Sequence, residues 1–320
     1  MLYLNKKDIS SLIVYEEVIQ IIERAMEIYE SKDFTMPDRI TVNNGDTETY
    51  LYMPCLTKEA KGTKILTLNS ENYKLNKPML QGVMLVNNPK SGEIECILDG
   101  ASVTAYRTGA VGSTGIKYTS PETCKNLGVI GTGVQGFYQS LYAVSVRPIE
   151  NIFVFDLDKN KCEEFAKNLQ KELHNVKVIP MDDTRELVEK SEIIVTVTPS
   201  SKPVMPDDES LLKGKHFVGI GSSKHKMREY PEAIYKLLDK VYIDVDFAME
   251  ESGDLITPCE KGWLKEEKVE TLFSGIKNNS IDKNKTTFYK SVGMALFDVL
   301  VADYIYKKAV EKGIGQNIIL

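Results

Sequence analysis

The sequence predicts an α/β protein with two domains, one a doubly wound parallel sheet and the other a discontinuous α+β domain. After Ser120 and Pro121, short apolar segments alternate with amphipathic ones, which is typical of a parallel sheet with helical crossovers. Before that break, short alternating segments separated by turn residues predict a mostly antiparallel sheet. A helical pattern near residue 291 is long enough to return to the first domain, so we expect domains at 1–119 with 294–320, and at 120–293.

The first domain is predicted to contain a flanking helix and several short strands. Apolar residues recur at helical spacing over residues 15–29. Residues 39–42 and 49–52 alternate on either side of an Asn-Gly turn, which is typical of a hairpin. The other predicted elements are strands at 63–68, 82–87 and 94–98 and a helix near 104–118.

The second domain is predicted to hold a series of parallel strands. They lie at residues 126–130, 151–155, 176–179, 193–197, 216–219 and 240–244. In an open parallel sheet, a ligand binds beyond the carboxyl ends of the strands. The loops that follow these strands are therefore where a ligand is expected.

A glycine motif follows the first of these strands. The segment Gly131-Thr-Gly-Val-Gln-Gly136 leads into a helical segment, and Asp156 closes the next strand twenty residues later. The first glycine allows a tight turn, the second lets backbone amides approach a pyrophosphate, and the third lets the helix pack against the sheet. The helix N-terminus then faces the diphosphate with its partial positive charge. This is the dinucleotide-binding fingerprint of a Rossmann-type domain, and its candidate cofactor contacts are Gly131, Thr132, Gly133, Val134 and Gln135.

Asp156 also predicts which dinucleotide binds. Its carboxylate could accept hydrogen bonds from the adenosine ribose hydroxyls, whereas an extra phosphate there would meet a like charge. The next residues, Leu157, Asp158 and Lys159, supply no arginine to hold such a phosphate. We therefore expect NAD rather than NADP. The alternative is that Asp156 is an ordinary exposed loop residue.

Composition argues against several other classes of protein. The formal net charge is -6 and basic residues are interspersed with acids, which disfavours a nucleic-acid surface. No apolar run reaches bilayer-spanning length and residues 1–8 lack the apolar core of a signal peptide, so no membrane partner and a cytoplasmic location are expected. The five cysteines are widely spaced without a paired motif, so neither a disulfide framework nor a metal site is expected.

Three cations in the first domain are candidates for substrate binding. Arg39, Lys64 and Arg107 lie in or near predicted strands or in a segment of small residues, where a charge needs a partner. The planar guanidinium suits a substrate carboxylate, and a lysine whose pKa is lowered by burial can act as an acid or a base. The alternative is three unrelated cations at the surface or in salt bridges.

Several ordered motifs resemble the ornithine cyclodeaminase and mu-crystallin family over nearly the whole chain. The most recognisable segment is Ile-Leu-Asp-Gly-Ala-Ser-Val-Thr-Ala-Tyr-Arg-Thr-Gly-Ala at 97–110, and the fingerprint carries the glutamine usual in the family. Residues 36–39, 52–54, 62–64 and 291–298 match in the same order. Chance agreement of so many ordered motifs is not expected.

The resemblance implies a homodimer formed through the first domain, NAD or NADP bound by the second, and a small amino or imino acid held between them. Arg39, Lys64 and Arg107 would bind the substrate carboxylate, and Met53 would line the pocket. On the cofactor side, Thr108 would contact the phosphates, Thr198 would border the dinucleotide and Ser291 would lie near the nicotinamide, together with the fingerprint and Asp156.

One position departs from the members that cyclise ornithine. Those members carry an aspartate after the fifth strand, where this chain has Ser223. A serine is a poor general base without a neighbour that activates it. His225 in the same loop could exchange a proton near neutral pH, or it could be an exposed histidine without a role. The catalytic candidates are therefore Lys64, Ser223 and His225, with Lys64 the better proton donor.

The expected function is NAD(H)-dependent reduction of a small imino acid. Suitable substrates are pyrroline-2-carboxylate or a related ketimine, or a 2-oxo acid such as pyruvate with ammonia. One alternative is an ornithine cyclodeaminase, which converts L-ornithine to L-proline and ammonia with recycled NAD. Another is a non-catalytic, dinucleotide-dependent binding protein of mu-crystallin type. Substrate side-chain length, reaction direction and assembly beyond a dimer stay open.

Overall fold

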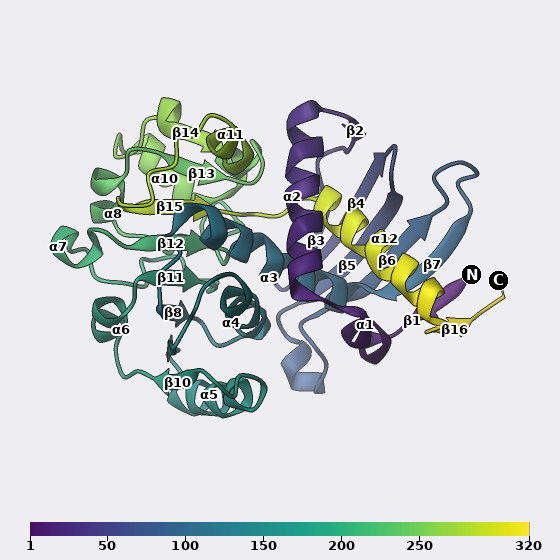
Figure 1. Cartoon of the computed structure of the whole chain (residues 1–320), viewed down its shortest axis with the longest axis horizontal. Coiled ribbons are helices and arrows are strands. Elements are labelled where there is room, and N and C mark those ends of the chain that lie inside the picture. The colour runs from purple at the N-terminus through teal and green to yellow at the C-terminus, as the bar shows by residue number, and fades with distance from the viewer. Residues whose placement is uncertain (320) are drawn as a thin grey trace. The chain divides into compact units, whose positions relative to one another are not determined.

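The computed structural model describes residues 1–319, and the chain divides into two compact units. Unit 1 combines Met1–Arg107 with the segment from Met294 onward, and unit 2 is Thr108–Gly293 (Figure 1). The predicted boundary was residue 119, whereas the observed one lies inside helix α3, Gly100–Thr119. The change of sequence texture at Ser120 and Pro121 marks the end of that helix, whose last turns already pack within unit 2. Unit 1 is therefore made of two separate stretches of the chain.

Unit 1 is built on a single sheet with the strand order β16-β1-β7-β6-β5-β4-β2, and β3 pairs with β4. All its pairs are antiparallel except β1 with β7. Its strands are β1 (Leu2–Leu4), β2 (Phe34–Thr35), β3 (Ile40–Asn44), β4 (Glu48–Thr57), β5 (Lys61–Asn69), β6 (Leu80–Asn87), β7 (Ile94–Asp99) and β16 (Gln316–Asn317). Its helices are α1 (Lys6–Leu12), α2 (Tyr15–Ser31), the 3-10 helix η1 (Asn72–Leu75) and α12 (Ala295–Lys312).

Helix α12 covers one face of this sheet. It contacts β4, β5 and β6 and also packs against α2; Figure 1 shows α12 in yellow and α2 in purple. Leu296, Phe297 and Val301 of α12 are fully buried and form the core with the strands. The C-terminal segment therefore completes the hydrophobic core of the first unit, which explains why the chain returns to it.

Unit 2 is a parallel sheet with the strand order β10-β9-β8-β11-β12-β15-β13-β14. Its strands are β8 (Asn126–Ile130), β9 (Asn151–Phe155), β10 (Lys177–Pro180), β11 (Ile193–Thr196), β12 (His216–Gly219), β13 (Val241–Ile243), β14 (Val269–Thr271) and β15 (Thr287–Lys290). Its helices are α4 (Val134–Val146), α5 (Lys159–Glu172), α6 (Thr184–Lys190), α7 (Glu209–Leu212), α8 (Glu232–Leu237), α9 (Ala248–Glu251), α10 (Gly253–Glu260), the 3-10 helix η2 (Glu266–Lys268) and α11 (Leu272–Lys277). Figure 1 shows α4 on one side of this sheet and α6, α7 and α8 on the other.

The observed topology confirms the predicted fold class. From the central strand β8, the chain first adds β9 and β10 on one side. It then crosses back and adds β11 and β12 on the other side, as in a doubly wound sheet. Every strand predicted in the second half is present within about one residue of its expected bounds, and β14 and β15 were not predicted. Strand β15 lies between β12 and β13. Near Ser291 the sequence pattern placed the start of a helix, but Ser291 follows β15 and helix α12 begins at Ala295.

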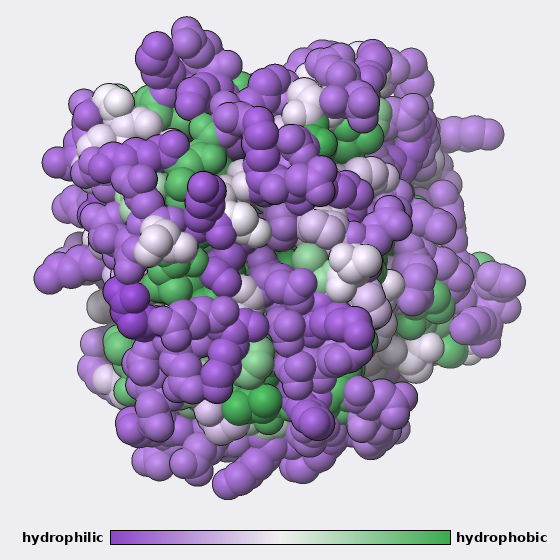
Figure 2. Space-filling view, turned by 60° about the vertical axis from the view of Figure 1, so that its left-hand side comes forward, coloured by the Kyte–Doolittle hydropathy of each residue, from purple (hydrophilic) through white to green (hydrophobic). Residues whose placement is uncertain are grey.

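No helix among residues 1–319 is both long and apolar enough to cross a membrane. The face in Figure 2 is mostly hydrophilic, and its apolar side chains form small separate groups. Scattered apolar groups of this kind are normal at a protein surface.

Candidate functional site

Lys64 and Arg107 of unit 1 converge on one buried carboxylate. Lys64 lies on β5 with 1 % of its surface exposed, and its Nζ is 2.6 Å from Oδ1 of Asp298 on α12. Arg107, near the middle of α3, donates from Nε to the same oxygen at 3.0 Å. Asp298 is fully buried, and its other oxygen, Oδ2, has no hydrogen-bond partner among the described residues. Two cations and one carboxylate leave a buried positive charge, which attracts an anionic ligand.

Burial and neighbouring charges place the Lys64 pKa near neutral pH. Its pKa is lowered to about 7, first by burial and then by the positive charges of Arg107 and Arg39, while Asp298 opposes the shift. A lysine with this pKa holds a proton in part of the molecules and can release it to a substrate. Lys64 and Arg107 are buried and share one carboxylate, so these two are neither surface residues nor unrelated, and both form a salt bridge with Asp298.

The two other predicted substrate contacts lie in the same part of unit 1. Met53 is buried on β4 directly opposite Lys64. Arg39 is half-buried just before β3, and its charge acts on the Lys64 pKa. The pairing of β4 with β5 therefore places Met53 beside Lys64, and α3 brings Arg107 to the same carboxylate. Their roles in binding substrate stay a prediction.

The glycine motif of unit 2 forms an open turn. Gly131 has φ +106°, which favours glycine, and a Cβ on Gly136 would lie 2.3 Å from the Gly131 carbonyl oxygen. Helix α4 then starts at Val134 without a side-chain cap on its first amides and without an acidic residue in its first turn. A Cβ on Gly133 would meet nothing within 4 Å, so there is space beside the backbone. These features fit the pyrophosphate of a dinucleotide.

Asp156 lies beside this turn at the end of β9. Its Oδ2 accepts hydrogen bonds from the Thr132 amide at 3.0 Å and hydroxyl at 2.8 Å, and its Oδ1 accepts one from the Asp158 amide at 3.1 Å. Burial alone would raise the pKa of this carboxyl, but the hydrogen bonds from Thr132 and Asp158 hold it below its usual value. The group is therefore ionised and held in place next to the turn, where it can accept ribose hydroxyls.

The other predicted cofactor contacts lie near the carboxyl ends of the unit 2 strands or on or beside helix α4. Thr108 is buried, its Oγ1 has no hydrogen-bond partner among the described residues, and its carbonyl accepts a bond of 2.7 Å from Gln139 of α4. Thr198 follows β11, and its Cγ2 would lie 3.0 Å from a Cβ on Gly131. The buried Ser291 hydroxyl donates to Asp244 at 2.6 Å. The Gln135 Oε1 is also buried without a partner in the described chain.

The loop after β12 holds the two remaining catalytic candidates. Ser223 is half-buried and His225 is exposed.

The residues that organise this part of unit 2 were missed by sequence analysis. Glu229, Asp254 and Lys290 are all buried, with Lys290 Nζ 3.7 Å from Asp254 Oδ2. The sequence did contain one signal for such buried pairs. A charged residue stands in a mostly apolar segment at Lys290 and at Asp298, and a charge in such a segment needs a buried partner.

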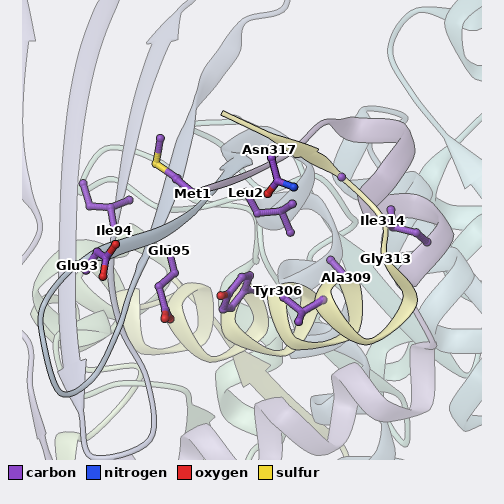
Figure 3. Close-up of a pocket in the computed structure, with 12 residues that line it drawn as sticks. Met1, Leu2, Glu93, Ile94, Glu95, Tyr306, Ala309, Gly313, Ile314 and Asn317 are labelled. Atoms are coloured by element: carbon purple, nitrogen blue, oxygen red, sulfur yellow. The ribbon is translucent and has the colours of Figure 1, made fainter. Parts of the chain in front are cut away.

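A separate cavity of about 370 Å³ lies at the far end of unit 1. Figure 3 shows its lining, which includes Met1, Glu93, Glu95, Tyr306 and Ile314. None of the predicted site residues lines it, so the candidate site is not there. Within residues 1–319, no group of three or more His, Cys, Asp or Glu side chains is arranged to hold a metal ion.

Known proteins resemble the chain over its full length. A Δ1-pyrroline-2-carboxylate reductase from Bacillus cereus is 30 % identical over 99 % of both chains. An alanine dehydrogenase from Archaeoglobus fulgidus is 26 % identical over 99 % of this chain and 98 % of its own. A solved structure of the Thermococcus litoralis Δ1-pyrroline-2-carboxylate reductase with NADH and L-proline superposes with a TM-score of 0.92 at 30 % identity, covering 99 % of this chain and 100 % of that one.

The family relationship follows from these matches and from the motifs. A model of the ornithine cyclodeaminase/mu-crystallin family matches residues 2–313. That span includes all of unit 2, most of unit 1 and every predicted site residue. The chain therefore belongs to the ornithine cyclodeaminase/mu-crystallin family.

Proposed function

We propose that the protein is an NADH-dependent reductase of small cyclic imino acids, with Δ1-pyrroline-2-carboxylate as the preferred substrate type. The observation that carries this proposal is the buried cluster of Lys64, Arg107 and Asp298, in which a lysine with a pKa of about 7 lies beside an arginine that can bind a carboxylate. The full-length likeness to pyrroline-2-carboxylate reductases supports the same substrate class.

In this function, the first unit binds and protonates the substrate. The Arg107 bond to Asp298 uses Nε, so the guanidinium keeps its terminal amino groups as donors for the substrate carboxylate, and Arg39 adds a second cation. The Lys64 ammonium gives its proton to the imine nitrogen as a C–H bond forms at the imine carbon. Its neutral amine regains a proton from solvent only after the product has left the site. Fixing the carboxylate positions the imine, and positioning supplies much of the rate.

The second unit would hold NADH, which supplies the hydride. The Gly131 turn and the uncapped start of α4 would bind the pyrophosphate, and Asp156 would accept the ribose hydroxyls. Thr108, with its buried hydroxyl, would add a phosphate contact. A 2′-phosphate would meet the Asp156 charge, which favours NADH over NADPH.

The test is to follow NADH absorbance with the purified protein and Δ1-pyrroline-2-carboxylate, and to quantify proline. We expect one proline for each NADH consumed, a slower reaction with NADPH, and no ammonia from L-ornithine with NAD. Pyruvate with ammonia is run alongside to compare reductive amination. Ammonia and proline from ornithine without net change in NADH would instead identify a cyclodeaminase that works with Ser223. NADH binding without turnover of any substrate would identify a binding protein.

We also infer a homodimer that forms through the uncovered face of the unit 1 sheet. Ile40, Tyr52, Ile65 and Val83 are consecutive cross-strand partners on β3, β4, β5 and β6. They point away from the face that α12 covers, and Ile40, Tyr52 and Val83 are 54 %, 38 % and 37 % exposed. A continuous apolar row across four strands is typical of a surface that a second copy buries.

The dimer predicts a mass in solution of twice the 36.0 kDa of one chain. Ile65→Lys places a charge in the middle of the apolar row and is expected to give monomers in sedimentation equilibrium. Val310→Lys, which changes an exposed apolar residue of α12, is the matched control and should leave the mass unchanged. A monomeric wild type, or an Ile65→Lys variant of unchanged mass, would contradict this interface.

A further inference from the structure

One buried carboxylate in unit 2 joins two loops at the carboxyl end of the parallel sheet. Glu229 Oε1 accepts hydrogen bonds from the Thr198 amide at 2.7 Å and hydroxyl at 2.8 Å, in the loop after β11. Glu229 Oε2 accepts bonds from the amides of Gly221 at 3.0 Å and Ser222 at 3.1 Å, in the loop after β12. With four donors on two oxygens, the hydrogen bonds favour the ionised form of the side chain.

The two loops are packed tightly against each other at this point. A Cβ on Gly221 would lie 2.3 Å from both the amide nitrogen and the carbonyl oxygen of Thr198. Thr198 in turn lies against Gly131 of the fingerprint turn. A shift of the loop after β12 would therefore reach the turn that we expect to hold the pyrophosphate.

Two further buried charges surround Glu229. Asp254 of α10 accepts hydrogen bonds from the amides of Glu229 at 2.7 Å and Tyr230 at 3.1 Å, which fixes the backbone that carries the carboxylate. The Lys290 ammonium, at the end of β15 and fully buried, lies 3.7 Å from Asp254. The Lys290 charge acts to lower the pKa of Glu229 and so favours the ionised carboxylate. The next residue, Ser291, begins the loop held by Asp244.

We propose that Glu229 is a positioning residue for the cofactor: its ionised carboxylate holds the Thr198 and Gly221–Ser222 loops in the arrangement that binds the dinucleotide. This role rests on the proposed function, in which the loops after β11 and β12 lie beside bound NADH. Burial raises the pKa of Glu229 to about 7. The positive charge of Lys290 acts to lower this pKa, and the negative charge of Asp254 acts to raise it. Protonation would place an O–H where an amide N–H must donate, so the loops should loosen as pH falls through neutrality.

The first test compares Glu229→Gln with wild type by calorimetric titration with NADH between pH 6 and 8. The amide has one acceptor oxygen, so its NH₂ must face the donors of one loop. We expect Kd for NADH to rise at least about tenfold in the variant. Wild-type Kd should also rise as pH falls through 7, whereas Kd of the variant should change much less. Glu232→Gln, which removes a surface carboxylate paired with Lys236, is the matched control and should stay within about twofold.

A second measurement needs neither a variant nor cofactor binding. Amide exchange of Thr198, Gly221 and Ser222 in the wild-type protein, corrected for the intrinsic effect of pH, should show less protection at pH 6 than at pH 8. Equal protection at both pH values, or wild-type NADH affinity in Glu229→Gln, would overturn the proposal. A wild type that binds no NADH would instead refute the proposed function, and the exchange result would still decide whether Glu229 holds the loops.

Discussion

Replacing Lys64 with methionine is expected to lower kcat/KM for imine reduction by roughly a thousandfold, mainly through kcat. Methionine preserves the length and most of the volume of the side chain but cannot donate a proton. The position is buried on β5, between β4 and β6, and its side chain reaches Asp298 of α12, so solvent has little access to replace the lost donor. Steady-state NADH oxidation with Δ1-pyrroline-2-carboxylate measures the loss.

Lys64→Arg separates the charge of this residue from its proton. An arginine keeps a cation beside Asp298, so KM should rise only modestly, but its pKa is too high for proton donation and kcat should stay close to that of Lys64→Met. Lys58→Met is the control, because Lys58 is 82 % exposed and pairs with Asp33 at the surface. Wild-type kcat in Lys64→Met would assign proton donation to another group, and His225 would then be the next residue to change.

Sequence patterns predicted the fold well where each element carries its own signal. The alternation of strands and helices after residue 120 and the glycine fingerprint were sufficient for the second unit, because both depend on local periodicity. Strand β15, Thr287–Lys290, was missed. It has only four residues, and its polar ends Thr287 and Lys290 leave two consecutive apolar residues, too few for a strand pattern. Its place between β12 and β13 is a property of the whole sheet that no local pattern contains.

The candidate site was predicted only in part, for a related reason. Single cations such as Lys64 and Arg107 were identified because they interrupt apolar or small-residue segments. Their shared partner is Asp298, 191 positions beyond Arg107, and only the packing of α12 against β5 reveals it. Glu229 was missed similarly, since its four hydrogen-bond donors come from two different loops. Sequence identifies residues that need a partner, and the tertiary structure identifies which partner each one has.

Asp298→Asn is expected to shift the pH dependence of imine reduction toward acid. Lys64 must carry a proton to donate it, so kcat/KM should fall as pH rises through the Lys64 pKa, which lies near 7 in the wild-type protein. Asp298 is the group that raises this pKa against burial and the two arginines. Without its charge, Lys64 loses its proton at lower pH. The variant should therefore be least active relative to wild type above neutrality and recover part of its activity on acidification.

The same variant should also be less stable, because Arg107 cannot release its proton when its partner is removed. A buried cation left unpaired lowers the free energy of unfolding by roughly 3–5 kcal/mol, which urea denaturation can measure. Asp303→Asn is the matched control: it lies on the same helix and pairs with the exposed Lys307 at 2.7 Å. If the pH profile of Asp298→Asn coincides with that of wild type, Asp298 does not set the protonation of Lys64. A loss of stability without a pH shift would then restrict Asp298 to holding Arg107 in place.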